Sequence, residues 1–145
     1  MTVLTVISCG AIKAPYATMA AQLYRGTFFT VSWRWAHAVS PVGDIRIFSA
    51  KHGLVAPTTW LEPYELRMGA PGSISAASVA RQLQDIENLD SIRAVIGQSY
   101  RRILNDAAAS TGVQVEYPLS SLPDQRRGYQ MQAMNAHVRE IQATQ

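Results

Sequence analysis

The feature that most constrains the fold is a regular alternation of strand-like and helix-like segments along the chain. Short β-branched and apolar runs, typical of buried strands, occur at residues 2–8, 44–50, 91–97 and 113–117. Helix-like patterns lie between and after them, at residues 14–25, 27–39, 75–89, 98–110 and 124–142. This order predicts an α/β fold, a three-layer sandwich with a mostly parallel sheet of about four strands and helices on both faces.

Length and composition fit that architecture within a single α/β domain, which we expect to span residues 1–145. A chain of 145 residues can bury a core without disulfides, and its single cysteine, Cys9, suits a reducing cytoplasm. The apolar run within residues 1–10 is too short for a signal peptide or a membrane span, so we expect no membrane partner. A net charge of +3 permits a nucleic-acid partner without requiring one. The sequence leaves the oligomeric state open.

Parallel strands end at one edge of a sheet, and ligands of such folds bind beyond that edge. The candidate substrate-binding residues near the predicted strand ends are Ser8, Cys9, Gly10, Lys13, Ser49, Lys51, Tyr64 and Tyr100. The turn after the first strand, with Lys13 close behind it, suits an anion, although it has neither the GxGxxG nor the Walker spacing. The plainer interpretation is that these residues pack tight turns or face water.

Residues 51–71 are predicted to form a long loop after the second strand, and this loop holds the candidate catalytic residues His52 and Glu62. A histidine titrates near neutral pH and can move protons. Glu62 precedes Pro63, which restricts the backbone and so favours a fixed direction for the carboxylate. Tyr64 suits stacking on a base. In the alternative interpretation the loop is a rigid turn whose carboxylates face water and whose tyrosine packs.

The sequence predicts neither a metal nor a cofactor. The three histidines are His37, His52 and His137, and no two of them have the spacing of metal ligands. No serine–histidine–aspartate order stands out, because such triads assemble only in space.

The loop resembles a motif of the YaaA family, in which Ser-Gly/Ala-x-x-Gly-Leu is followed by a short spacer and x-Pro-Tyr-x-Leu-x-Met-Gly. The corresponding segments here are SAKHGL at residues 49–54 and EPYELRMG at residues 62–69. The chain is more similar to small phage and bacterial domains of unknown function with Ser-Cys-Gly, Lys and Leu-Tyr before Ser-Ala-Lys-x-Gly-Leu and Glu-Pro-Tyr. Those first elements stand here as Ser8-Cys9-Gly10, Lys13 and Leu23-Tyr24.

The resemblance implies an intracellular α/β domain that acts on or binds nucleic acid. YaaA proteins are associated with peroxide stress and with DNA binding, and similar segments occur in archaeal enzymes that modify deazaguanine in tRNA. Our first hypothesis is an enzyme directed at a nucleobase or nucleoside, free or within DNA or RNA. It would cleave or exchange a glycosidic bond or modify the base.

Two other hypotheses stay open. One is a non-catalytic DNA- or nucleotide-binding protein, as in a stress response or a phage–host interaction. The other is a phage protein that binds a host protein through Trp33, Trp35 and Trp60.

Overall fold

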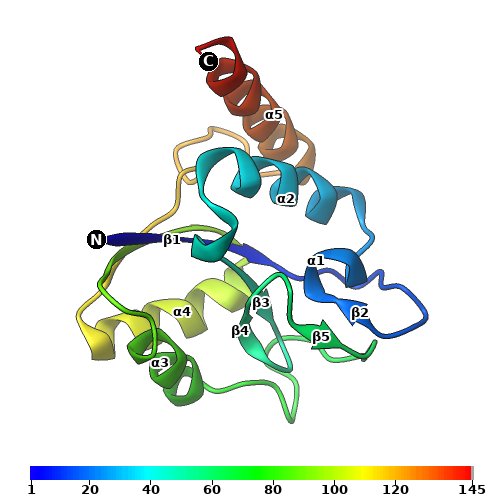
Figure 1. Cartoon of the computed structure of the whole chain (residues 1–145), viewed down its shortest axis with the longest axis vertical. Coiled ribbons are helices and arrows are strands. Elements are labelled where there is room, and N and C mark those ends of the chain that lie inside the picture. Colours follow the sequence, from blue (N-terminus) through cyan, green and yellow to red (C-terminus); the bar gives the residue numbers. More distant parts are fainter. Residues whose placement is uncertain (145) are drawn as a thin grey trace.

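The computed structural model describes residues 1–144, which form a five-stranded sheet between two layers of helices (Figure 1). The strands of this sheet are β1 (Thr2–Ser8), β3 (Ile45–Ser49), β4 (Gly53–Val55), β6 (Leu89–Val95) and β7 (Gln114–Glu116). They lie in the order β4-β3-β1-β6-β7, and only β4 runs antiparallel to its neighbour. The predicted α/β class and mostly parallel sheet are confirmed.

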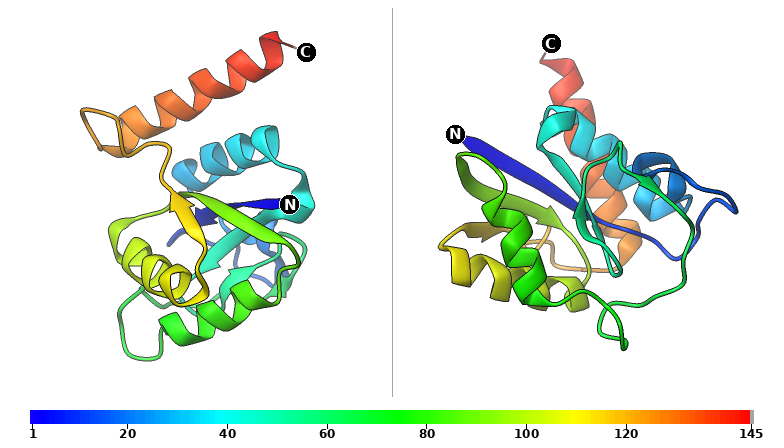
Figure 2. Two further views of the ribbon diagram at one scale, coloured as in Figure 1. Left: turned by 90° about the vertical axis from the view of Figure 1, so that its left-hand side faces the viewer. Right: turned by 60° about the horizontal axis from the view of Figure 1, so that its bottom comes forward.

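The helices cover both faces of the sheet, as the two views of Figure 2 show. They are α1 (Ala20–Leu23), α2 (Thr27–Val39), α3 (Ala76–Gln84), α4 (Gln98–Thr111) and α5 (Arg127–Ala143), with a 3-10 turn, η1, at Val42–Asp44. Helices α2 and α5 pack together above one face, and α3 and α4 pack together below the other. Among residues 1–144, no helix combines the length and the apolar character needed to cross a membrane.

Strand β1 shows why the sequence dictates this layering. Successive side chains of a strand point to opposite faces, and here both faces are covered. Leu4 and Val6 are buried between the sheet and helices α3 and α4, whereas Ile7 is buried on the face covered by α2 and α5. The buried hydroxyl of Thr5 is satisfied by Ser40 Oγ at 2.6 Å. A run that is apolar at both parities therefore becomes a central strand.

The helix predicted over residues 14–25 is wrong except at α1. Residues Thr18–Met19 form β2, which pairs antiparallel with β5 (Trp60–Leu61) in a separate two-stranded sheet beside the main one. The backbone N–H groups of Ala20 and Ala21 donate to the carbonyls of Thr59 and Pro57. Pairing with a segment 41 to 43 residues away therefore overrides the local helical preference, and a local sequence pattern does not reveal such a contact.

Two other helices are shorter than predicted. The pattern at residues 75–89 extends past the end of α3, because Asn88 adopts a left-handed conformation (φ 55°) and Leu89 already belongs to β6. The pattern at residues 124–142 begins before the first residue of α5. The expectation for residues 27–39 coincides with α2.

The segment predicted as one long loop, residues 51–71, contains β4 and β5. The chain reverses after β3 through Gly53, whose φ of 73° is readily adopted only by glycine. Gln82 of α3 holds this reversal from the side. Its Nε2 donates to the His52 carbonyl at 2.9 Å, and its Oε1 accepts from the Leu54 N–H at 2.8 Å. The position of His52 is therefore set by a helix on the opposite side of the turn.

We predict that Gly53→Ala costs about 3 kcal/mol of folding stability, since a left-handed non-glycine residue costs about 1–2 kcal/mol and an overpacked site costs about 1–3 kcal/mol. A Cβ at this position would overlap Gln82 Oε1 and Ile74 Cδ1. The matched control is Gly112→Ala at the end of α4, where φ is 76° but a Cβ meets nothing within 4 Å. Urea unfolding should show a loss of only about 1 kcal/mol for the control. Equal losses in the two variants would contradict the close packing at Gly53.

Candidate functional site

Three parallel strands end side by side at the edge where the candidate residues gather. The chain passes from β1 through α2 to β3 on one side, and β6 lies on the other side of β1. The topological switch point therefore lies between β1 and β6, where open α/β sheets bind ligands. Cys9, directly after β1, and Tyr100, in the first turn of α4 after β6, meet across this point with Sγ and Oη 3.1 Å apart.

A chain of hydroxyl groups lies at the neighbouring end of β3. Ser49 Oγ accepts the backbone N–H groups of Lys51 and His52, so its own proton is directed to Tyr64 Oη. Tyr64 Oη in turn lies 2.6 Å from Tyr24 Oη and is left to donate to it. The Tyr64 hydroxyl, in the loop after β5, therefore links the end of β3 to the segment after α1 through two hydrogen bonds.

The tyrosines of the site stay protonated at neutral pH. Burial raises the pKa of Tyr24 to about 12. Burial, and then the proximity of Cys9, raises the pKa values of Tyr64 and Tyr100. The site therefore offers neutral O–H groups that donate or relay hydrogen bonds, and no phenolate base.

The two lysines of the chain, Lys13 and Lys51, both lie beside the Tyr64 ring. Lys13 Nζ is 4.5 Å from the ring centroid and Lys51 Nζ is 5.8 Å from it. Within residues 1–144, neither ammonium group forms an ion pair with a carboxylate. Two ammonium groups gathered without a counter-charge favour an anionic ligand such as phosphate.

His52 lies edge-on to the same ring, with centroids 5.5 Å apart and an interplanar angle of 89°. Burial, and then the charge of Lys51, lowers the pKa of His52 from its ordinary value of 6.5. The imidazole is therefore neutral at pH 7 and able to accept a proton.

Not every predicted residue belongs to this network. Glu62 is exposed, and among the contacts of residues 1–144 it has no hydrogen bond or ion pair. Ser8 is buried at the end of β1. Gly10 has room for a Cβ, with nothing within 4 Å, so no close approach there requires glycine. The structure brings together Cys9, Lys13, Ser49, Lys51, His52, Tyr64 and Tyr100.

The structure adds two residues that the sequence reasoning did not select. Tyr24 ends the hydroxyl chain, and its one signal in the sequence was the Leu-Tyr pair of the resemblance. It is placed by a β-bridge between Tyr24 and Lys13, which a helical interpretation of this segment hides. Gln82 supports the turn at His52 from α3, and nothing in its local sequence indicates that role.

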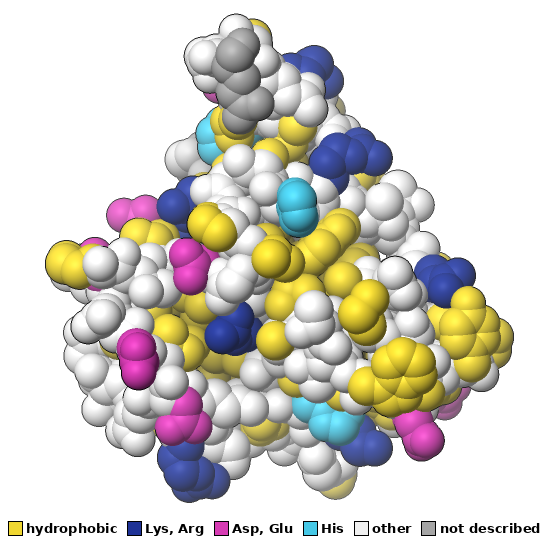
Figure 3. All heavy atoms as spheres, viewed as in Figure 1, with side chains coloured by type: hydrophobic (Ala, Val, Ile, Leu, Met, Phe, Trp, Pro, Cys, Tyr) yellow, Lys and Arg dark blue, Asp and Glu magenta, His cyan; other side chains and the backbone are white. Residues whose placement is uncertain are grey.

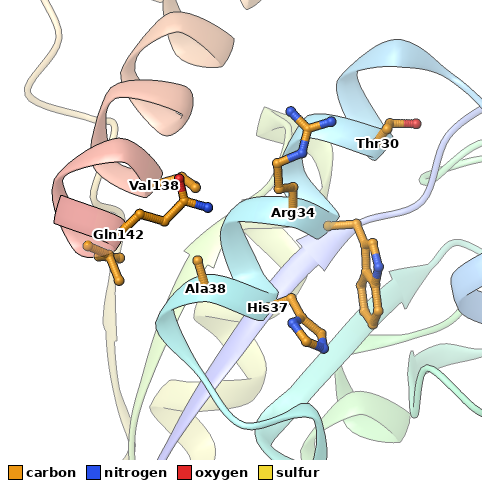
Figure 4. A pocket seen from close by; sticks show the side chains of 8 residues that line it. Thr30, Arg34, His37, Ala38, Val138 and Gln142 are labelled. Carbon is orange, nitrogen blue, oxygen red and sulfur yellow. The ribbon is translucent and has the colours of Figure 1, made fainter. Parts of the chain in front are cut away.

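A separate pocket of about 630 Å³ lies between α2 and α5, away from the candidate residues. Figure 4 shows Arg34 and His37 of α2 on one side of it and Val138 and Gln142 of α5 on the other. No candidate site residue lines it.

The three tryptophans do not share one surface. Trp35 is buried, with its Nε1 donating to His137 Nδ1 at 3.0 Å. Trp33 lies half-buried beside the α2–α5 pocket, whereas Trp60 on β5 is 67% exposed. The hypothesis of a host-binding surface built from all three is therefore wrong for Trp35, which is committed to the contact between α2 and α5.

Fold and site together define an α/β protein with a mostly parallel sheet and a cluster of lysine, histidine and hydroxyl groups at the ends of its central strands. Comparison with known protein families assigns the chain to one of them. A family of unknown function, DUF6884, matches residues 4–136, and the chain belongs to this family. The match spans every residue of the cluster. No curated protein matches the chain. Within residues 1–144, no group of three His, Cys, Asp or Glu side chains is arranged to hold a metal ion.

We predict that stability falls between pH 10 and about 12 because of Tyr24. Its folded pKa of about 12 exceeds the unfolded value of about 10, so its contribution is full below pH 10 and is lost as the pH rises through 12. Tyr24→Phe should reduce the slope of unfolding free energy against pH in this window by up to about 1.4 kcal/mol per pH unit. Tyr129→Phe, at an exposed position, should leave the slope as it is. An unchanged slope in Tyr24→Phe would contradict the assignment.

Proposed function

We propose that the protein is an enzyme directed at a nucleobase or nucleoside, free or within DNA or RNA, and that its substrate binds at the switch point. The observation that carries the proposal is the arrangement around Tyr64. Both lysines of the chain and a neutral His52 surround this ring, and neither lysine has a carboxylate partner among the described residues. A phosphate-bearing, hydrogen-bonding substrate suits such a site.

In this proposal the lysines bind the anionic part of the substrate. Lys51 is exposed, whereas Lys13 is half-buried. One ammonium group therefore lies at the solvent side of the site and the other lies deeper within it. Tyr64 holds both ammonium groups beside its ring while its hydroxyl is engaged by Ser49 and Tyr24. Its role is therefore to position the lysines as much as to contact a base.

The switch point supplies the contacts to the base or sugar. Tyr100 O–H is a neutral donor next to Cys9, and the backbone N–H of Cys9 is already taken by the Phe48 carbonyl. The side chains of Cys9 and Tyr100 are thus the groups left to contact a ligand here. A neutral donor such as the Tyr100 hydroxyl recognises carbonyl and ring nitrogen acceptors of a base without adding charge.

His52 is the proposed general base. A neutral imidazole accepts a proton from an attacking water or from the substrate. The imidazolium then loses this proton to solvent, which restores the neutral form. Glu62 lies ten residues further along the chain, directly after β5, and is exposed. We propose that Glu62 acts only once the substrate is bound, either as a contact to it or as the second proton-transfer group beside His52.

One observation favours the alternative, a non-catalytic DNA- or nucleotide-binding protein. The network around Tyr64 includes no carboxylate among the described residues, so a second proton-transfer group must come from Glu62 or from the substrate. The cations alone suffice for binding. The resemblance of residues 49–69 to YaaA proteins agrees with either function.

We predict that the protein releases or alters a base when it is incubated with single- or double-stranded DNA, RNA or free nucleosides, including modified ones. Mass spectrometry of the products tests this. His52→Gln should slow turnover at least about 100-fold, as expected for loss of a general base. His37→Gln, at an exposed position of α2, is the matched control and should keep the wild-type rate.

The pH dependence gives an independent check on His52. Because its pKa is lowered, the wild-type rate should fall only below pH 6.5, as the imidazole becomes protonated. The turnover rates of Glu62→Gln and Glu65→Gln, both changed in the segment after β5, are to be compared. A slower rate in Glu62→Gln alone indicates that Glu62 acts at the substrate, whereas equal rates indicate a general effect of charge. Binding without product for any substrate would support the non-catalytic alternative, and normal turnover in His52→Gln would refute the role of His52.

A further inference from the structure

Two adjoining pockets lie beyond the cluster, at the start of α4. One, of about 850 Å³, is bounded by residues 68–69, the first turns of α4 and Tyr117. The other, of about 180 Å³, lies between Phe28, the start of α4 and the start of α5. Both are lined by Gln98 and Arg101, so the two pockets meet at these residues. We call this combined surface the arginine groove.

The arginine groove is lined by cations without anions. Arg101 and Arg102 line the larger pocket, and Arg101 and Arg127 line the smaller one. No aspartate or glutamate lines either pocket. The nearby carboxylate of Asp124 is engaged by Arg126, at 2.7 Å. On the face shown in Figure 3, by contrast, basic side chains are scattered singly among acidic and hydrophobic ones.

Aromatic rings hold two of these arginines in place. The Cζ atom of Arg101 lies 4.5 Å from the centroid of the Tyr117 ring, and that of Arg127 lies 4.5 Å from the centroid of the Phe28 ring. Tyr117 is itself anchored, because its hydroxyl donates to Asn105 Oδ1 at 2.6 Å. Arg101 Nε donates to the Ile96 carbonyl at 3.3 Å, and among the hydrogen bonds of residues 1–144 its terminal amino groups form none. The N–H edge of a guanidinium matches the geometry of phosphate oxygens.

The arginine groove continues from the candidate site. Tyr100, whose hydroxyl lies against Cys9, precedes Arg101 on α4, and Ser99 on its other side lines the larger pocket. The first turn of α4 therefore borders both surfaces. A ligand that occupies the switch point and continues past the first turn of α4 enters a surface lined by Arg101, Arg102 and Arg127.

We propose that the arginine groove binds the phosphodiester backbone of a single-stranded nucleic acid whose target nucleotide occupies the site around Tyr64. This inference rests on the proposed function for the nature of the polymer. A free nucleotide needs only Lys13 and Lys51, whereas three further arginines outside the cluster correspond to neighbouring phosphates. A single strand fits because a base must leave the duplex stack before it enters a pocket.

Fluorescence anisotropy with labelled 20-nucleotide DNA and RNA strands tests the inference on the full chain. In Arg102→Gln/Arg127→Gln we expect the dissociation constant to rise at least tenfold at about 0.1 M salt. The slope of log K against log salt should become shallower by about 1.4, because each single-strand phosphate contact contributes about 0.7. Arg34→Gln/Arg139→Gln removes the same charge from exposed positions of α2 and α5 and should stay within about twofold of wild type. Circular dichroism melts verify that both variants fold.

Equal weakening in the two double variants, or no weakening in either, would overturn the inference. So would an oligoglutamate peptide that competes as well as unlabelled oligonucleotide, since the arginine groove would then bind acidic peptide. Parallel product assays with the wild-type protein separate the two proposals. Product from free nucleosides without strand binding would refute the arginine groove and leave the proposed function standing. Strand binding that depends on Arg102 and Arg127, without product from any substrate, would support the arginine groove and refute the enzyme.

Discussion

The hydrogen bonds of the Tyr64 hydroxyl are the interaction on which the rest of the site depends. One phenol joins Ser49 at the end of β3 to Tyr24 beyond α1, and so ties the loop after β5 to the main sheet. Because the Tyr64 hydroxyl forms hydrogen bonds with two partners, the position of its ring is fixed. Lys13, Lys51 and His52 all lie beside this ring. The interaction is partly buried, and a polar group left unpaired in a buried site typically costs about 1–3 kcal/mol, so breaking it costs at most about this much for each group.

Three kinds of functional group meet at this edge of the sheet. The lysines supply positive charge, the buried and half-buried tyrosines supply neutral donors, and His52 supplies a group that accepts a proton at pH 7. Burial produces the last two properties together, since it raises the pKa of a phenol and lowers that of an imidazole. The arginine groove extends the positive charge away from the site along α4. A ligand with a base at one end and phosphates along its length uses all of these features.

The fold was largely predictable because its signals are local. Runs such as residues 2–8 are apolar at both parities, which only a strand covered on two faces explains, and the helix at residues 27–39 has the expected limits. The limits of α3 and α5 were predicted too wide, and the one error of type arose where distant segments pair. Residues 14–25 look helical, yet Thr18–Met19 pairs with Trp60–Leu61.

The site was predictable to the extent that strand ends converge. Parallel topology brings Cys9, Ser49 and Tyr100 to one edge, as expected from the order of elements. Tyr24 and Gln82 reach the site through a bridge and a helix that no local pattern reveals. Glu62 was selected for its chemistry, and the structure leaves it in solvent because the proline-restricted backbone presents Tyr64, not the carboxylate, to the network.

The central claim is that a nucleotide-like ligand binds around Tyr64, and an NMR titration tests it most directly. Isotope-labelled protein would be titrated with a nucleoside monophosphate while the amide shifts are followed. The account predicts the largest shifts at Cys9, Lys51, His52, Tyr64 and Tyr100, with those at Arg34 and His37 in the α2–α5 pocket unchanged. Shifts confined to the α2–α5 pocket, or no shifts at any residue, would contradict it.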